Sequence, residues 1–265
     1  MAVWIFFSGI LVLFANPDVS SALKASRSFS VSLSGEYGEG SDAFVARDRH
    51  QTDVYNCLTW LYWVLATAYA KTDVEEFRRY LDDLRYYDQI SFAERKHFVD
   101  RWLVYDPAPL KPLEQVACRA DQTTMVHLQL QRFRQTKNYQ CSLYQEDQTG
   151  QETLMIPYLS LVQSHQCVEA LVDGYYVAFF VPSEEWLVRW STIGDFGTVH
   201  AMIIEKSGDA VLVHHASIDK RQVIEESWSE FTTRLATVAK GYRIFDLDDN
   251  WTVPQPLPLG SEECR

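Results

Sequence analysis

The sequence has little positive charge. Of its 265 residues only 24 are Lys or Arg, against 36 Asp or Glu, which gives a formal net charge of -12. Phosphate contacts need clustered Lys and Arg, so this balance excludes a general nucleic-acid binder. The sequence also has no Gly-x-Ser-x-Gly elbow, which disfavours a serine nucleophile. Its early glycines, at 35, 38 and 40, are wrongly spaced for a dinucleotide loop. We therefore expect no cofactor.

The N-terminus has no Lys or Arg before an apolar run at residues 2–15. This run is shorter than the ~20 residues that a membrane span needs, and Asn16, Pro17 and Asp18 close it. Small residues follow at 20–22. The pattern predicts a signal peptide over residues 1–22 that is cleaved near Ala22, with a permanent membrane anchor as the alternative. The rest, residues 23–265, shows no repeat or linker and is predicted to be one domain.

Cysteine is present in an odd number. The five cysteines are Cys57, Cys118, Cys141, Cys167 and Cys264. In an exported protein an odd count leaves one thiol over. One free Cys57 and two disulfides among the others is the simplest arrangement. Cys118–Cys141 is a plausible pair, although spacing alone does not fix the connectivity.

Hydrophobic periodicity predicts helices first and mostly antiparallel strands afterwards, which is typical of an α+β domain. Helices are expected from Cys57, from Thr72 or Asp73, over 91–102 and around 227–232. Strands are expected at 124–130, 175–181 and 241–246, with a hairpin formed by 199–204 and 210–215. The segment 155–159 is either a short edge strand or the start of a helix that continues through Leu171.

Cys57 begins a nearly unbroken apolar segment that is predicted to be a buried helix. Unpaired backbone N–H groups and the positive end of the helix dipole would then surround its thiol. That setting lowers a thiol pKa, and the thiolate is the nucleophilic form. Cys57 is therefore a candidate nucleophile. The alternative is a buried structural cysteine.

A cysteine nucleophile needs a base, and the base needs a partner that orients it. His200 opens a predicted strand after a glycine-containing loop, and His215 lies on the next strand, where its ring could approach that of His200. His214 should point to the opposite face. A histidine is more often a surface or core residue than a base. A zinc site made from Cys57, His200 and His215 is another reading, but no short-spaced ligand pair supports a metal.

Several short segments occur in a fixed order along the chain. They are Gly35-Glu36-Tyr37, Asn56-Cys57-Leu58-Thr59-Trp60, Leu84-Arg85-Tyr86, Arg95-Lys96-His97-Phe98 with Trp102, Ile156-Pro157-Tyr158, Leu171-Val172-Asp173-Gly174-Tyr175-Tyr176-Val177, Val199-His200-Ala201-Met202-Ile203 and Val213-His214-His215-Ala216-Ser217. Together they resemble the papain-like NlpC-type cell-wall peptidases. Within that group the chain is most similar to the bacterial N-acetylmuramoyl-L-alanine amidase-like family.

The resemblance implies a papain-like NlpC-type fold, in which N-terminal helices that carry the cysteine pack on a mostly antiparallel sheet. It implies that Cys57 is the nucleophile, that His200 is the general base and that His215 orients the base. It places Tyr37 near the oxyanion site, and it implies no metal. Arg95 and His97 match a family motif without an evident role.

The chain departs from the family pattern at three places. Asn56 stands before the cysteine where Asp is usual, Leu58-Thr59-Trp60 replaces the usual residues after it, and Tyr175 follows Gly174 where Asp is usual.

The implied function is an exported, cysteine-dependent amide hydrolase that acts on peptidoglycan or its fragments through a thioester. It would cut either the muramoyl–alanine amide or a bond in the stem peptide. We expect a periplasmic or secreted protein without a membrane span after signal removal; the sequence leaves its oligomeric state open. One alternative is a papain-like acyltransferase or a peptidase on a non-wall substrate. Another is a non-catalytic wall-binding or scaffold protein on a degraded hydrolase fold, whose Cys57 would not be alkylated rapidly by iodoacetamide at mildly acidic pH.

Overall fold

The computed structural model describes residues 17–33, 50, 52–87, 90, 96, 99–113, 116–129, 151–185, 197–253 and 255–257. Within these ranges no helix is both long enough and apolar enough to cross a membrane. The predicted apolar leader at residues 2–15 lies outside them.

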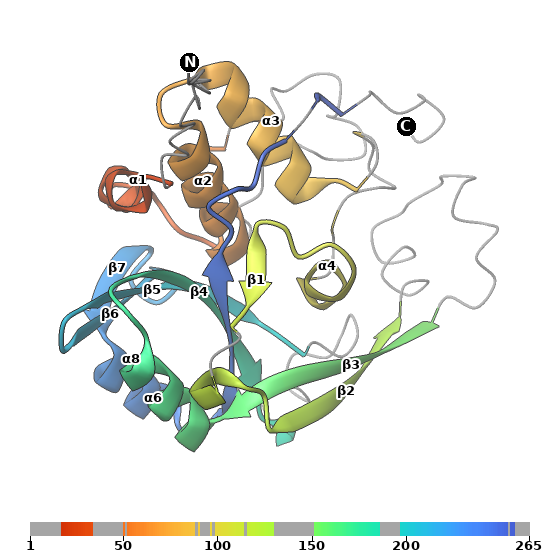
Figure 1. The fold of residues 1–265 in the computed structure, drawn as a ribbon, viewed down its shortest axis with the longest axis vertical. Coiled ribbons are helices and arrows are strands. Elements are labelled where there is room, and N and C mark those ends of the chain that lie inside the picture. The colour runs from red at the N-terminus through yellow and green to blue at the C-terminus, as the bar shows by residue number, and fades with distance from the viewer. Residues whose placement is uncertain are drawn as a thin grey trace, which may run out of the picture.

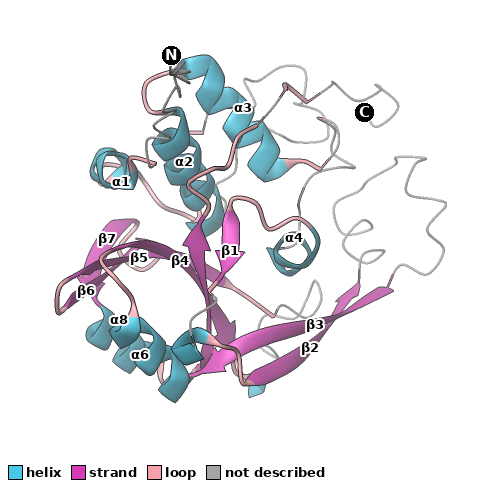
Figure 2. Ribbon diagram, in the orientation of Figure 1, coloured by secondary structure: helices cyan, strands magenta, loops and turns pink. Residues whose placement is uncertain are grey.

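The described part of the chain contains six α-helices, one short 3-10 helix and one eight-stranded sheet (Figure 2). The helices are α1 Val19–Ser26, α2 Cys57–Ala70, α3 Val74–Arg85, α4 Val99–Tyr105, η1 Val116–Cys118, α6 Leu161–Ala170 and α8 Trp228–Leu235. The strands are β1 Leu110–Pro112, β2 Gln122–Gln129, β3 Gln151–Ser160, β4 Gly174–Pro182, β5 His200–Ser207, β6 Ala210–Ser217, β7 Gln222–Ser227 and β8 Ala239–Leu247.

The strands pair in the order β2-β3-β8-β4-β5-β6-β7, and β1 pairs with β8. All of these pairs are antiparallel. In Figure 1 helices α1, α2 and α3 lie on one side of the sheet and α6 and α8 on the other, while β2 and β3 extend away from the body. The predicted α+β class, with helices before antiparallel strands, is confirmed.

The central strand β4 is buried on both faces and separates two hydrophobic clusters. Val177 and Phe179 pack in the cluster of α1, α2 and α3, whereas Ala178 and Phe180 pack in the cluster of α6 and α8. A strand that is covered on both faces needs apolar residues at every position rather than at alternate ones. This explains the continuous apolar run at 175–181.

Capping side chains mark several helix starts. The Asp73 carboxylate accepts hydrogen bonds from the backbone N–H groups of Glu75 and Glu76, at 2.8 and 2.9 Å, and so begins α3 where the sequence predicted. Ser160 caps α6, and its hydroxyl accepts from the Gln163 N–H at 3.3 Å. The segment 155–159 is therefore strand, and the helix begins only after it.

Two strands were not predicted, and one predicted helix lies partly outside the described residues. The sequence analysis missed β1 and β7, which are short and largely polar. The predicted helix over 91–102 starts outside the described residues, and its described portion is α4.

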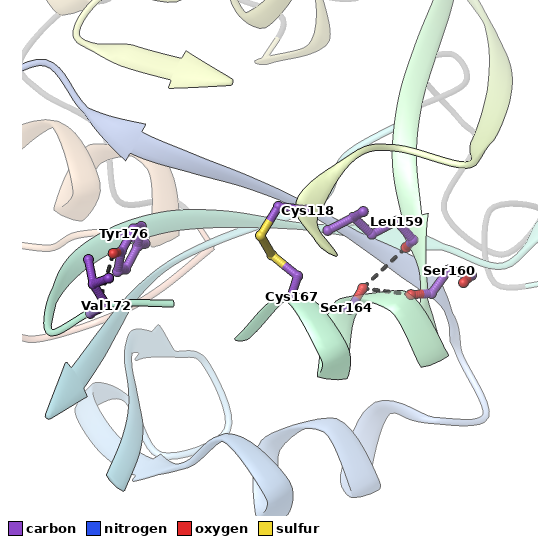
Figure 3. The surroundings of a disulfide bond; sticks show 7 residues. All are labelled: Cys118, Leu159, Ser160, Ser164, Cys167, Val172 and Tyr176. Atoms are coloured by element: carbon purple, nitrogen blue, oxygen red, sulfur yellow. Dashed lines mark hydrogen bonds between the residues drawn. A yellow bond between two sulfur atoms is a disulfide. The ribbon is translucent and has the colours of Figure 1, made fainter. Parts of the chain in front are cut away.

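The structure contains a disulfide between Cys118 of η1 and Cys167 of α6 (Figure 3). The suggested Cys118–Cys141 pairing is therefore wrong, because Cys118 already has a partner. The fold brings α6 back over η1, and both sulfurs lie in the cluster of α6 and α8. Cys57 is free, as expected. Cys141 and Cys264 lie outside the described residues.

Helix α1 crosses the position at which signal cleavage was predicted. Val19, Ala22 and Leu23 are buried against the rest of the cluster of α1, α2 and α3. The N–H of Asp18 donates to the Ala68 carbonyl at 3.0 Å, and the Asp18 side chain caps the helix. A cut at Ala22 would remove the first half of a packed helix, so a cleavage that spares the fold would have to precede Asp18.

Candidate active site

Cys57 is the first residue of α2, and the residue before it fixes the helix start. The Asn56 side-chain oxygen accepts from the N–H groups of Leu58 and Thr59 at 3.0 and 2.9 Å, and the Thr59 hydroxyl accepts from the Asn56 N–H at 2.9 Å. This reciprocal capping box uses the N–H groups of Leu58, Thr59 and Asn56, while the Cys57 N–H faces its own sulfur. Asn56 thus does locally what an aspartate would do at this position.

Further contacts hold the lead into α2. Tyr55 bridges to Val31 and stacks on Phe29 with a ring-centroid distance of 4.3 Å. One turn into the helix, the Trp60 indole N–H donates to the Ser26 hydroxyl at 3.0 Å. The end of α2 that carries the cysteine is therefore attached to the segment that follows α1.

Residue Cys57 is half-buried, and its thiol lies against the start of β5. The Ala201 backbone N–H is directed at its sulfur, which places Cys57 beside the residue next to His200. Burial raises the pKa of the Cys57 thiol, and the N–H groups of Ala201, Leu58 and Cys57 itself lower it by less. The expected lowering of this pKa by the helix terminus is therefore present but is outweighed by loss of solvent.

His200 and His215 are brought together as predicted. His200 Nε2 lies 3.0 Å from His215 Nδ1, and the two rings meet edge to face with centroids 5.0 Å apart. Because Nε2 of His200 contacts His215, Nδ1 is the ring nitrogen of His200 left for a third group. The His215 side chain is only 3% exposed.

Burial sets the charge of both imidazoles. It lowers the pKa of His200 to about 3, and the nearby His215 and Arg234 act in the same direction. It lowers the pKa of His215 to about 4, again with Arg234 acting in the same direction. The resting site at neutral pH therefore holds a neutral thiol and two neutral imidazoles, rather than a thiolate and an imidazolium.

His214 points to the other face of β6, as alternation predicts. Its Nε2 lies 2.8 Å from Glu205 Oε2, and its Nδ1 lies 3.6 Å from Glu225 Oε2. It makes no described contact with His200 or His215. The two adjacent histidines thus have separate surroundings.

The sequence analysis missed Glu226 and Arg234. Glu226 Oε1 lies 2.8 Å from His215 Nε2, and the same oxygen contacts the Arg234 guanidinium. Glu226 is on β7, whose residues 222–227 contain too few apolar positions to show strand periodicity. The signal that could have located it is the register: β7 pairs antiparallel with β6, which carries His215.

Asp100 of α4 holds the loop that leads into His200. Its carboxylate accepts from the Gly197 N–H at 2.7 Å, the Thr198 N–H at 3.3 Å and the Thr198 hydroxyl at 2.7 Å. Burial raises the pKa of Asp100, while the Thr198 hydroxyl and the charge of the buried Arg243 lower it. The start of β5 is therefore tied to a helix from the N-terminal half of the chain.

Three residues of the family motifs fall outside the part of the chain that the structure describes. Tyr37, Arg95 and His97 lie outside the described residues. Among the residues that are described, no cluster of His, Cys, Asp or Glu has the arrangement of a metal site.

Comparison with known proteins gives a family and a fold. Residues 35–238 match the AmiA-like family, described as N-acetylmuramoyl-L-alanine amidase-like. A solved protein from Legionella pneumophila, assigned to family DUF1460, is 17% identical, with a TM-score of 0.69, over 91% of this chain and 90% of its own. An N-acetylmuramoyl-L-alanine amidase from Bacteroides uniformis ATCC 8492 is 15% identical, with a TM-score of 0.63, over 87% of this chain and 97% of its own. No curated protein matches the sequence. At these identities the structural likeness shows the fold alone.

Proposed function

Since this chain belongs to the N-acetylmuramoyl-L-alanine amidase-like family, we propose that it is an exported, papain-like cysteine hydrolase of the NlpC type that cleaves an amide bond of peptidoglycan. The family description indicates a cell-wall amide hydrolase. The observation that carries the cysteine-dependent mechanism is the His200–His215 hydrogen bond beside the helix start that holds the free Cys57.

The neutral resting site supports a general-base mechanism. Nδ1 of His200 takes the Cys57 thiol proton as the sulfur attacks the amide carbon, so the nucleophile is charged only while it reacts. The Cys57 backbone N–H, which the Asn56 cap does not use, donates to the tetrahedral oxyanion.

In the remaining steps His200 acts first as a general acid and then again as a general base. The imidazolium of His200 gives its proton to the leaving amine, and the amide C–N bond breaks to leave a thioester on Cys57. Water then attacks the thioester carbonyl as His200 accepts one of its protons. The carboxylic acid leaves, and the thiol is restored when that proton returns to the sulfur.

Two features support export. The apolar leader at 2–15 has the length of a signal peptide rather than of a span. The Cys118–Cys167 disulfide is typical of an oxidising compartment. N-terminal sequencing of the exported chain tests this part, and a mature N-terminus that precedes Asp18 is expected because α1 is packed.

The decisive experiment is mass spectrometry of the products released from purified peptidoglycan and defined muropeptides. Wild type should release free stem peptides if it is an amidase, or truncated stems if it is an endopeptidase. Cys57→Ala and His200→Ala should lower the rate by roughly 10⁴-fold or more, because each removes a group that acts in the transition state.

His214→Ala is the matched control, since it deletes the neighbouring imidazole on the opposite face and should leave the rate within a few-fold of wild type. Hydrolysis that survives Cys57→Ala in a clean preparation would overturn the mechanism. Binding of peptidoglycan without any cleavage would instead favour a non-catalytic wall-binding protein.

Alkylation of Cys57 gives a second test that needs no substrate. Because burial raises the thiol pKa, the rate with iodoacetamide should be low at mildly acidic pH and should rise as the pH increases above neutrality. The sequence alone predicted the opposite, namely rapid reaction at mildly acidic pH. A rate that is already maximal at pH 5 would show that the thiolate exists at rest and would contradict the general-base step.

A further inference from the structure

The pair of histidines is the middle of a longer chain of polar contacts. Beyond His215 lies Glu226, whose side chain is 17% exposed and whose Oε1 is 2.8 Å from His215 Nε2. Beyond Glu226 lies Arg234, which is 46% exposed and contacts the same oxygen. The chain of contacts therefore runs from His200, through the buried His215, to solvent at Arg234.

Counting protons along this chain fixes where each hydrogen lies. A carboxylate that is paired with an arginine only accepts hydrogen bonds, so Nε2 of His215 must carry a hydrogen. Because His215 is neutral, its Nδ1 then has a lone pair and accepts from His200. The donor in that bond is Nε2–H of His200. Since His200 is also neutral, its Nδ1 is left bare.

Helix α8 supports this arrangement from one face. Ser227 begins the helix through a capping box with Glu230. Phe231 and Arg234 are three residues apart and so project from the same side. The buried Phe231 ring packs against His215 at 5.2 Å and lies near-parallel to His200 at 6.4 Å, while Arg234 reaches Glu226. One short helix therefore contacts both imidazoles and the group that orients them.

We propose that Glu226, held by Arg234, is a positioning residue that fixes the Nε2–H tautomer of both histidines and thereby keeps Nδ1 of His200 unprotonated toward Cys57. The proposal rests on the proposed hydrolase function for its kinetic consequence. The tautomers themselves are a property of the resting protein.

The test replaces the Glu226 carboxylate with an apolar side chain of similar volume. Glu226→Met removes the only described acceptor of His215 Nε2–H, so the tautomers should redistribute. Partners that orient metal-bound histidines contribute about 10–100-fold, and we expect a fall in kcat of similar size here, with KM changed by less than about two-fold. Glu226→Gln retains an amide oxygen and should recover most of that loss.

Glu225→Met is the matched control. Glu225 is adjacent in sequence but faces the other way, where it contacts Arg27 and His214. The same change there should leave kcat and KM at wild-type values. If Glu225→Met and Glu226→Met lower kcat equally, the effect is a general loss of stability and the proposal is wrong.

Nitrogen-15 NMR of the histidine rings reads the tautomers without any substrate. Wild type should show Nε2–H and a bare Nδ1 for both His200 and His215, and Glu226→Met should show mixed tautomers. An Nδ1–H signal for His200 in wild type would overturn the proposal. If the spectra agree while no peptidoglycan is cut, the positioning role stands and the hydrolase proposal fails.

Discussion

Cys57 and the histidines of the candidate site are held in place by different means. Cys57 is positioned by one continuous segment, in which Asn56 caps α2 and the apolar helix packs against the sheet. The histidines are positioned by contacts among β5, β6, β7 and α8, which share a short polar chain. Short-range sequence preferences therefore set the helix start at Cys57, although Ser26 and Phe29 also hold it, whereas the histidine pair depends on long-range contacts alone.

The two halves also sit against different clusters of the core. Cys57 and Leu58 pack against the cluster of α1, α2 and α3, whereas Phe231, which contacts both histidine rings, belongs to the cluster of α6 and α8. The sheet separates the two clusters, so each half of the site can be perturbed on its own. Four predictions follow that separation.

Removing the disulfide should weaken the histidine half most. Cys118 and Cys167 are 49 residues apart, and opening a loop of that size costs about 4 kcal/mol of unfolding free energy in the chain-entropy account. Urea unfolding of Cys118→Ser/Cys167→Ser measures this loss. The hydrogen-exchange rates of the backbone amides in α6 and α8 should increase more than those in α2. Equal acceleration in both sets would show that the two halves open as one unit.

Acid should destabilise the protein through the two histidines of the candidate site, and alkali should destabilise it through Cys57. The folded pKa values of His200 and His215, about 3 and 4, lie below the ordinary 6.5, so their contribution is present above pH 6.5 and is lost as the pH falls toward 4. The loss is up to about 1.4 kcal/mol per pH unit for each imidazole. The raised pKa of Cys57 acts oppositely, and its contribution is lost as the pH rises above the ordinary thiol value.

Thermal unfolding across pH separates the two effects. His215→Asn should make the acid side of the stability profile shallower, because only His200 then contributes, and should leave the alkaline side unchanged. Cys57→Ala should flatten the alkaline side only. If either variant changes both sides, the protonation states of the two halves are linked.

Gly197→Ala should disturb the approach to His200. A Cβ at this position would lie 2.6 Å from Val126 Cγ2 and 3.1 Å from Asp100 Oδ1, so the loop must shift. Overpacking of this kind costs about 1–3 kcal/mol, and the displaced strand start should also lower the hydrolysis rate.

Gly208→Ala is the control for that variant. A Cβ there meets nothing within 4 Å, and the cost comes only from its positive φ of 55° in the β5–β6 turn. Its stability should fall by about 1 kcal/mol with the hydrolysis rate retained. A normal rate in Gly197→Ala would show that the Asp100 contacts do not position His200.

The smallest effect is expected at the helix cap beside the nucleophile. Asn56→Ala removes the acceptor for two backbone N–H groups and should cost about 1 kcal/mol in chemical unfolding. Asn56→Asp keeps an acceptor and should be close to wild type. A loss in Asn56→Asp as large as in Asn56→Ala would mean that the amide group itself has a further role.

This contrast also explains what could be predicted from the sequence. The start of α2, the Asp73 cap and the β5–β6 hairpin follow from short-range patterns, and the structure confirms each of them. Alternation along β6 correctly separated His214 from His215.

The remaining features depend on contacts between distant segments. Glu226 lies on a strand with little apolar periodicity, and Arg234 has an ordinary surface position in the sequence. The partner of Cys118 is set by the return of α6 over η1 rather than by spacing. The direction of the Cys57 pKa shift was predicted wrongly, because helix position can be inferred from sequence whereas the extent of desolvation depends on the packed fold.

The raised pKa of the Cys57 thiol has a consequence for the working lifetime of the protein. Oxidation to sulfenic acid begins from the thiolate, and its rate follows thiolate content and exposure. A thiol that remains protonated at neutral pH offers little thiolate for oxidation while no substrate is bound. If Cys57 is the nucleophile of an exported hydrolase, as proposed, this arrangement protects it from oxidation between turnovers.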